Sequence, residues 1–141
     1  ARSGNAKGLA ILRGILADRN SPANRLAAWA LGQTGNVWDI AQLHNNVRHV
    51  EDPLIRCFHE MALANLGDPA GQAILVESLT SEDPTRRVYA ANFAGEGGVA
   101  VAADRLTALL DDPVADVRYR AAQSLLMLAH PALPEQVDNA P

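Results

Sequence analysis

The chain has 141 residues, of which 48% are hydrophobic, 20% are charged and only 4% are aromatic, and its formal net charge is −4. This length suffices for one domain with a buried core, whereas the acidic balance argues against nucleic-acid binding and no apolar run reaches the roughly 18–20 residues that cross a bilayer. The single cysteine, Cys57, excludes an internal disulfide. We expect a soluble, cytoplasmic protein that binds neither nucleic acid nor membrane.

The spacing of apolar residues, capping residues and glycines predicts eight helices. Four of them carry apolar side chains three and four positions apart. The other four begin at a capping residue and a proline, which suit the first turn of a helix, and three of these end at glycine. In chain order the helices are predicted at 6–18, Ser21-Pro22 to Gly35, 37–50, Asp52-Pro53 to Gly67, 69–79, Asp83-Pro84 to Gly97-Gly98, 99–110, and from Asp112 or nearer Ala115 to about 129.

One motif recurs four times along these helices at a period close to 31 residues. Each copy has an acidic or polar residue, a proline, an arginine and then a pair of residues that is small in three of the copies. These pairs follow one another at steps of 32, 31 and 31 residues: Ala27-Ala28, His59-Glu60, Ala90-Ala91 and Ala121-Ala122. A helical hairpin of this period cannot bury its apolar face alone, so the copies are expected to stack on one another.

The sequence therefore predicts an all-α fold, a right-handed α-α superhelix of about four helical hairpins. The repeat domain is expected to span residues 1–130, with repeats near 6–35, 36–67, 68–98 and 99–130. Residues 131–141 contain three prolines and several polar side chains and are expected to form a flexible tail.

Two stretches carry a resemblance to a known repeat. Residues 109–113 (Leu-Leu-Asp-Asp-Pro), together with 117–122 and 125–126, resemble the HEAT-like repeat of phycobilisome lyases, and residues 25–32 are similar. The resemblance implies a HEAT-like solenoid and, for function, a non-enzymatic scaffold that binds another protein. The alternatives are a subunit or relative of a phycobilin lyase that handles an open-chain tetrapyrrole, and an array with only a structural role.

His59-Glu60 is the strongest candidate in the sequence for a metal-binding or catalytic site. HEAT-like deoxyhypusine hydroxylases, which this pair resembles, carry His-Glu pairs in several repeats and hold two irons with them. Here the other three copies have Ala-Ala at that place, and one pair supplies at most two ligands. Cys57 lies two residues from His59, so the two side chains of one helix would point in different directions. We predict no catalytic residue, no metal and no cofactor, and we expect His59 to be partly buried and hydrogen-bonded.

A ladder of arginines and acids also follows the repeat. It consists of Arg56, Arg87 and Arg118, with Asp52, Asp83 and Asp112. The ladder could bind anions, or each arginine could hydrogen-bond to carboxylates and carbonyls in the neighbouring interhelical turns. Its repetition in register favours the structural role.

Partner binding is expected on the proline-initiated helices, which we place on the concave side of the superhelix. Two rows of equivalent positions combine aromatic, Met and polar residues, as binding hot spots do: Leu26, Phe58, Tyr89 and Arg120, and Trp29, Met61, Asn92 and Gln123, with Tyr119 beside them. The alternative is that Trp29, Phe58 and Met61 pack as core. The first and last helices lack a clearly polar outer side, so either end could pair with a second copy or continue into further repeats.

Overall fold

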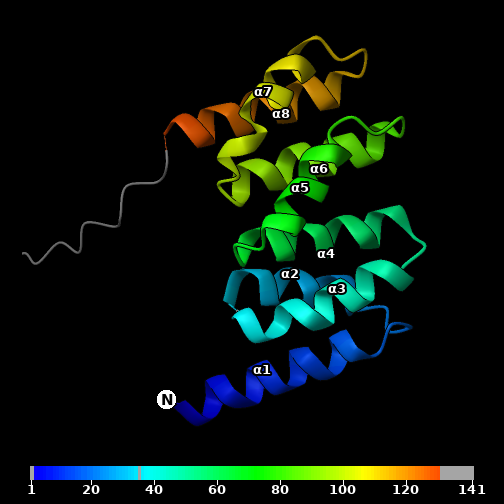
Figure 1. Ribbon diagram of the computed structural model, residues 1–141, viewed down its shortest axis with the longest axis vertical. Helices are drawn as coiled ribbons and strands as arrows, with labels where there is room; N and C mark the ends of the chain where they lie inside the picture. The colour runs from blue at the N-terminus through cyan, green and yellow to red at the C-terminus, as the bar shows by residue number, and fades with distance from the viewer. Residues whose placement is uncertain (1, 35, 131–141) are drawn as a thin grey trace, which may run out of the picture.

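The computed structural model describes residues 2–34 and 36–130, and the predicted tail at 131–141 and the predicted helix end at Gly35 lie outside them. The described residues form α-helices and short 3₁₀ helices without a strand (Figure 1). This confirms the prediction of an all-α solenoid. The elements are α1 (Arg2–Ala17), α2 (Asn24–Thr34), η1 (Val37–Asp39), α3 (Ile40–His49), α4 (Pro53–Asn65), α5 (Pro69–Ser78), α6 (Pro84–Glu96), η2 (Ala100–Ala102), α7 (Ala103–Ala108), η3 (Leu109–Asp111) and α8 (Ala115–Ala129).

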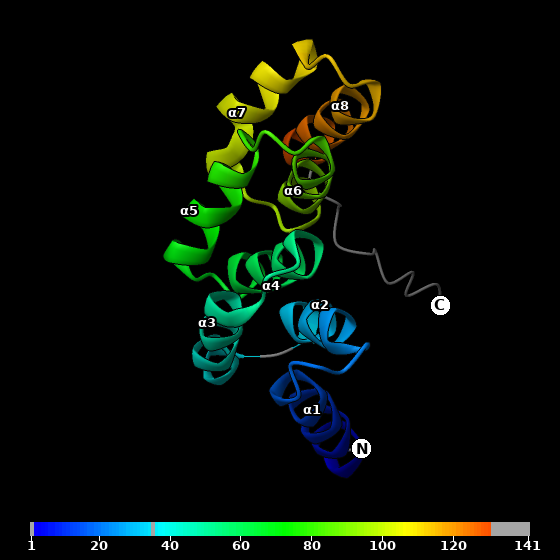
Figure 2. The same cartoon turned by 90° about the vertical axis from the view of Figure 1, so that its right-hand side faces the viewer.

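The helices pair into four stacked hairpins. The proline-associated helices α2, α4, α6 and α8 form one column, each in contact with the next (Figure 2). The helices α3, α5 and α7 lie along one side of this column, and α1 packs under α2 at the end of the stack. Within the described ranges, no helix is long and apolar enough to cross a membrane.

Local chemistry explains where the helices begin and end. The Asp52 carboxylate accepts hydrogen bonds from the amides of the first turn of α4, Asp83 does the same for α6, and a proline follows each. Gly67 and Gly98 have φ angles of 80° and 61° and close α4 and α6 with paired hydrogen bonds back to the last turn. Two helices begin later than the capping residue and proline of the motif: α2 begins at Asn24, after a turn at Pro22-Ala23, and α8 begins at Ala115.

Close contacts between column helices depend on residues without a large side chain. A Cβ atom built on Gly32 of α2 would lie 2.7 Å from the Ala62 Cα of α4, and one on Gly95 of α6 would lie 2.8 Å from the Ser124 Cα of α8. Between α4 and α6 the equivalent position is Ala64, and this pair of helices packs less extensively than the other two pairs. The hairpins can therefore nest only where these positions stay small.

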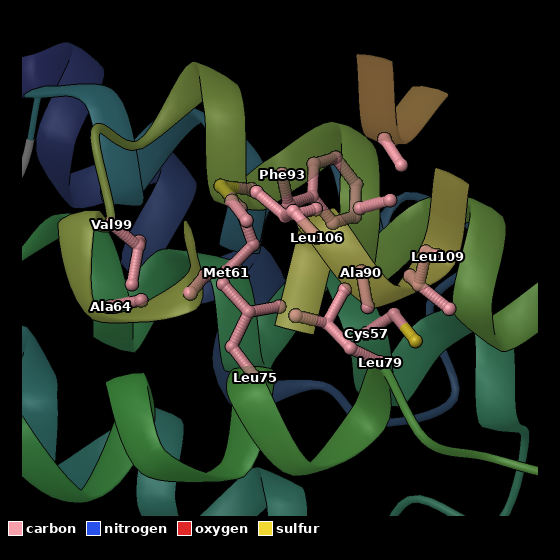
Figure 3. Packing of buried hydrophobic residues seen from close by; sticks show 14 of the residues in the cluster. Cys57, Met61, Ala64, Leu75, Leu79, Ala90, Phe93, Val99, Leu106 and Leu109 are labelled. Carbon is pink, nitrogen blue, oxygen red and sulfur yellow. The ribbon is translucent and has the colours of Figure 1, made fainter. Parts of the chain in front are cut away.

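The core consists of two clusters that meet at α4. One is formed mainly by α1 to α4 and includes Leu16, Leu31 and Leu63. The other is formed by α4 to α8, and Figure 3 shows Met61 within it, among Leu75, Phe93 and Leu106. Helix α4 thus contributes side chains to both clusters, from opposite sides of the helix.

We predict that Gly32→Ala destabilises the chain. The added methyl would meet backbone atoms of α4, which cannot move without shifting the whole helix, so we expect a loss of about 1–3 kcal/mol despite the better helix propensity of alanine. The matched control is Gly14→Ala, because a Cβ at Gly14 in α1 meets no atom within 4 Å. This variant should raise the free energy of unfolding by about 0.5–1 kcal/mol, since alanine favours the helix over glycine. Urea unfolding of both variants measures the difference, and equal effects would contradict the close approach.

Candidate functional site

The first of the two predicted rows crosses the column at an aromatic cluster. Phe58 of α4 and Tyr89 of α6 are half-buried with ring centroids 6.0 Å apart, and Phe93 lies edge-on to Phe58 at 5.0 Å. Leu26 of α2, at the same repeat position, is 55% exposed. The guanidinium of Arg25 lies 5.8 Å from the centre of the Phe58 ring, a distance at which a cation is attracted to the ring face.

The second row is interrupted at its middle. Trp29 of α2 is 43% exposed, whereas Met61 of α4 is fully buried and accepts a hydrogen bond from the Asn65 amide on its sulfur at 3.1 Å. The prediction that Met61 contacts a partner is therefore wrong, because its side chain fills the space between α4, α5 and α6 and reaches no surface. For Met61 the alternative of a core residue holds.

The polar members of both rows join α6 to α8. Nη1 of Arg120 donates to the Asn92 and Gln123 side-chain oxygens, each at 3.2 Å, and the Asn92 amide donates to Glu96 at 3.0 Å. Tyr119 is 61% exposed, and the Arg120 guanidinium lies 5.4 Å from its ring centre. We call the exposed and half-exposed parts of both rows, together with Arg25, the column face: Arg25, Leu26, Trp29, Phe58, Tyr89, Asn92, Arg120 and Gln123.

The ladder arginines hold the turns between helices. Each donates to the backbone carbonyl six residues earlier, at Val50, Ser81 and Asp112, with distances of 2.9, 2.8 and 2.7 Å for Arg56, Arg87 and Arg118. In the first hairpin Asn24 does the same, since its amide donates to the Asp18 carbonyl at 3.0 Å. The arginine in the first copy of the motif is Arg25, but the residue four positions before the second member of the recurring pair is Asn24 in this copy and a ladder arginine in the other three.

The three ladder acids differ in what they bind. Asp52 and Asp83 are exposed and cap their helices. Asp112 is buried, and Nε and Nη2 of Arg87 donate to its two carboxylate oxygens at 2.8 and 3.1 Å. This fork of hydrogen bonds lowers the pKa of Asp112. The Arg87–Asp112 pair thus ties the third interhelical turn to the fourth.

His59 and Glu60 are both fully buried, and each is already bound by other side chains or the backbone. Nδ1 of His59 donates to the Ile55 carbonyl at 2.8 Å, which leaves Nε2 to accept from the Asn46 amide at 3.4 Å. Glu60 accepts from the Ser78 hydroxyl at 2.9 Å and from Arg86 at 2.8 Å. No group of three or more His, Cys, Asp or Glu side chains placed to hold a metal occurs in the described part of the chain.

Burial sets the titration of this segment of α4. It raises the pKa of the Cys57 thiol to about 12, so the thiol stays protonated and is a poor nucleophile. It also lowers the pKa of His59. For Glu60, burial raises the pKa, and the nearby Arg86 guanidinium and Ser78 hydroxyl act in the opposite direction. The geometry of the segment is that of a satisfied core network.

We predict that His59 makes the folded chain sensitive to mild acid. Its pKa in the folded state lies below the ordinary 6.5, so the unfolded chain binds more protons below that pH and folding stability falls as the pH falls through this range. The free energy of unfolding in urea, compared between about pH 7.5 and about pH 5.5, should drop more in the wild type than in His59→Gln. Glu60 titrates in both proteins, so the comparison isolates His59. An equal drop in both would contradict the assignment.

Comparison with known proteins places the fold in a family. The sequence model of the HEAT-repeat family matches residues 40–126. The match extends from α3 through most of α8 and covers more than half of the chain. The match concerns HEAT repeats as a class and does not single out the phycobilisome-lyase type. Among curated proteins, none matches the chain. The stacked hairpins, their period and this match agree, and the chain belongs to the HEAT-repeat family.

Proposed function

We propose that the chain is a non-enzymatic interaction module whose column face binds a segment of another protein. The supporting observation is the pair of exposed apolar side chains on α2, Leu26 and Trp29. The positions equivalent to Leu26 hold half-buried aromatic residues on α4 and α6, and the position equivalent to Trp29 on α4 holds the buried Met61. Tryptophan is enriched among the few residues that supply most of the binding energy of a protein interface, and these residues cluster near its centre. HEAT repeats commonly serve this role.

The charges on the column face indicate the chemistry of the partner segment. Arg25 at one end lies over Phe58, and Arg120 at the other end lies beside Asn92. Between these two guanidiniums the face offers the rings of Phe58 and Tyr89, which are 6.0 Å apart. Glu96 is the nearby acid, and it accepts a hydrogen bond from Asn92. We expect a partner segment with apolar residues in its middle and acidic residues toward its ends.

The experiment compares two exposed tryptophans. Trp29 lies on the column face, whereas Trp38 is 83% exposed on η1, outside both rows. Peptides selected from a random library on the full chain should bind Trp29→Ala about tenfold or more weakly than wild type, since loss of an anchor costs about 1.4–2 kcal/mol. They should bind Trp38→Ala with unchanged affinity, as measured by fluorescence anisotropy.

Circular dichroism of both variants checks that the helices are retained. Selected peptides that depend on Trp38, or on neither tryptophan, would show that the column face is not the docking surface. Sequencing the selected peptides tests the expected pattern of acidic ends around an apolar middle.

A further inference from the structure

A polar hollow of about 460 Å³ lies near the starts of α4 and α6, apart from the column face. Its wall includes Arg56 and Glu60 from α4, Ser78 from α5, Ser81 from the turn after α5, and Arg86 from α6. Glu77 also lines it. The hollow therefore contains two guanidiniums, two carboxylates and hydroxyl groups, and the pairing of these charges decides what it can bind.

One of the two guanidiniums already has a carboxylate. Nη2 of Arg86 donates to Glu60 at 2.8 Å, and both its Nε and Nη2 donate to the Ser78 hydroxyl at 3.2 and 3.0 Å. Glu60 is fully buried and is satisfied by these two neighbours. Arg86 and Glu60 are thus joined by a hydrogen-bonded ion pair. The charge of Arg56 also acts on Glu60, but no hydrogen bond joins Arg56 to a carboxylate within the described residues.

The repeat itself shows what Arg56 lacks. Arg87 occupies the equivalent place one repeat later, and its Nε and Nη2 hold the carboxylate of Asp112. The residue 31 positions before Asp112, and therefore its equivalent for Arg56, is Ser81. The serine hydroxyl is shorter and neutral. Among residues 2–34 and 36–130, therefore, no carboxylate takes the place beside Arg56 that Asp112 takes beside Arg87.

The hydrogen bonding of Arg56 reflects this difference. Its Nη2 donates to the Val50 carbonyl at 2.9 Å, whereas Arg87 makes the corresponding carbonyl contact through Nη1 and keeps Nε and Nη2 for the carboxylate. Nε of Arg56 is buried and has no acceptor among the described residues. A buried donor without an acceptor is unfavourable, so binding an acceptor at Nε would lower the free energy of the protein.

We propose that Arg56 and the Ser81 hydroxyl form a binding site for a carboxylate group supplied by another molecule. On binding, the carbonyl contact of Arg56 passes from Nη2 to Nη1, as in Arg87, and the carboxylate takes the fork of Nε and Nη2. Glu77 at the wall disfavours ligands with several negative charges in a compact group. The site is separate from the column face and does not rest on it.

Acetate is the probe, and the Nε–H signal of Arg56 in a nitrogen-15 NMR spectrum is the direct readout. Titration with sodium acetate, against sodium chloride at equal ionic strength, should move the Arg56 signal in a saturable way. The Arg87 signal should stay in place, because Asp112 already occupies that fork. No shift of Arg56 in the folded protein, or equal shifts of both arginines, would overturn the proposal.

Ser81→Asp tests the same idea from within the chain. The new carboxylate should fill the fork of Arg56 as Asp112 fills that of Arg87, so the variant should unfold at a higher temperature than wild type and bind acetate at least tenfold more weakly. Ser81→Asn is the matched control, because asparagine has nearly the shape of aspartate without its charge. This variant should show no such rise in unfolding temperature. A Ser81→Asp variant that is folded, no more stable than Ser81→Asn and still responsive to acetate would refute the site.

The source of the carboxylate is distinguished by a second arm. A short peptide with one glutamate, compared with its glutamine counterpart, reports a protein side chain as ligand, whereas a response to acetate and not to the peptide reports a small molecule. Either result is read at Arg56 and is independent of Trp29, so this proposal and the docking of a segment on the column face succeed or fail separately.

Discussion

The stack depends on how closely one column helix can approach the next. A Cβ atom on Gly32 or Gly95 would come within 2.7 or 2.8 Å of the backbone of the following column helix, so these two junctions pack closely only because the residue is glycine. Between α4 and α6 the equivalent position is Ala64, and the Phe93 ring packs at this junction edge-on to Phe58. The aromatic cluster at the middle of the column face thus lies at the junction that has no glycine at this position.

The turns follow a second constraint, which is the need to satisfy backbone carbonyls where two helices meet. A single side-chain donor at one repeat position meets this need in all four hairpins: Asn24, Arg56, Arg87 and Arg118. Within the described part of the chain, Arg87 is the one of these four that also holds a carboxylate from the next turn. Variation at the acceptor position, Ser81 against Asp112, therefore changes what an otherwise repeated arginine can bind.

Much of the fold could be predicted from the sequence because its signals are local and repeated. The capping residues Asp52 and Asp83 and the glycines Gly67 and Gly98 act within a few residues, and the structure places them as expected. The burial of Met61 could not be predicted in this way. Trp29 and Met61 share one repeat position, but α4 has α2 on one side and α6 on the other, whereas α2 lies near the end of the stack. Exposure depends on neighbours that one repeat does not encode.

The sharing of α4 between two clusters has a consequence for how the chain melts. Ala62 and Leu63 pack with the N-terminal hairpin, whereas Cys57, Met61 and Ala64 pack with the C-terminal ones. In a linear array, cooperativity is set by the coupling between adjacent repeats. A helix that supplies side chains to both halves couples them directly, so loss of α4 removes part of each core at once. The array should therefore lose its structure in a single concerted transition rather than fray hairpin by hairpin.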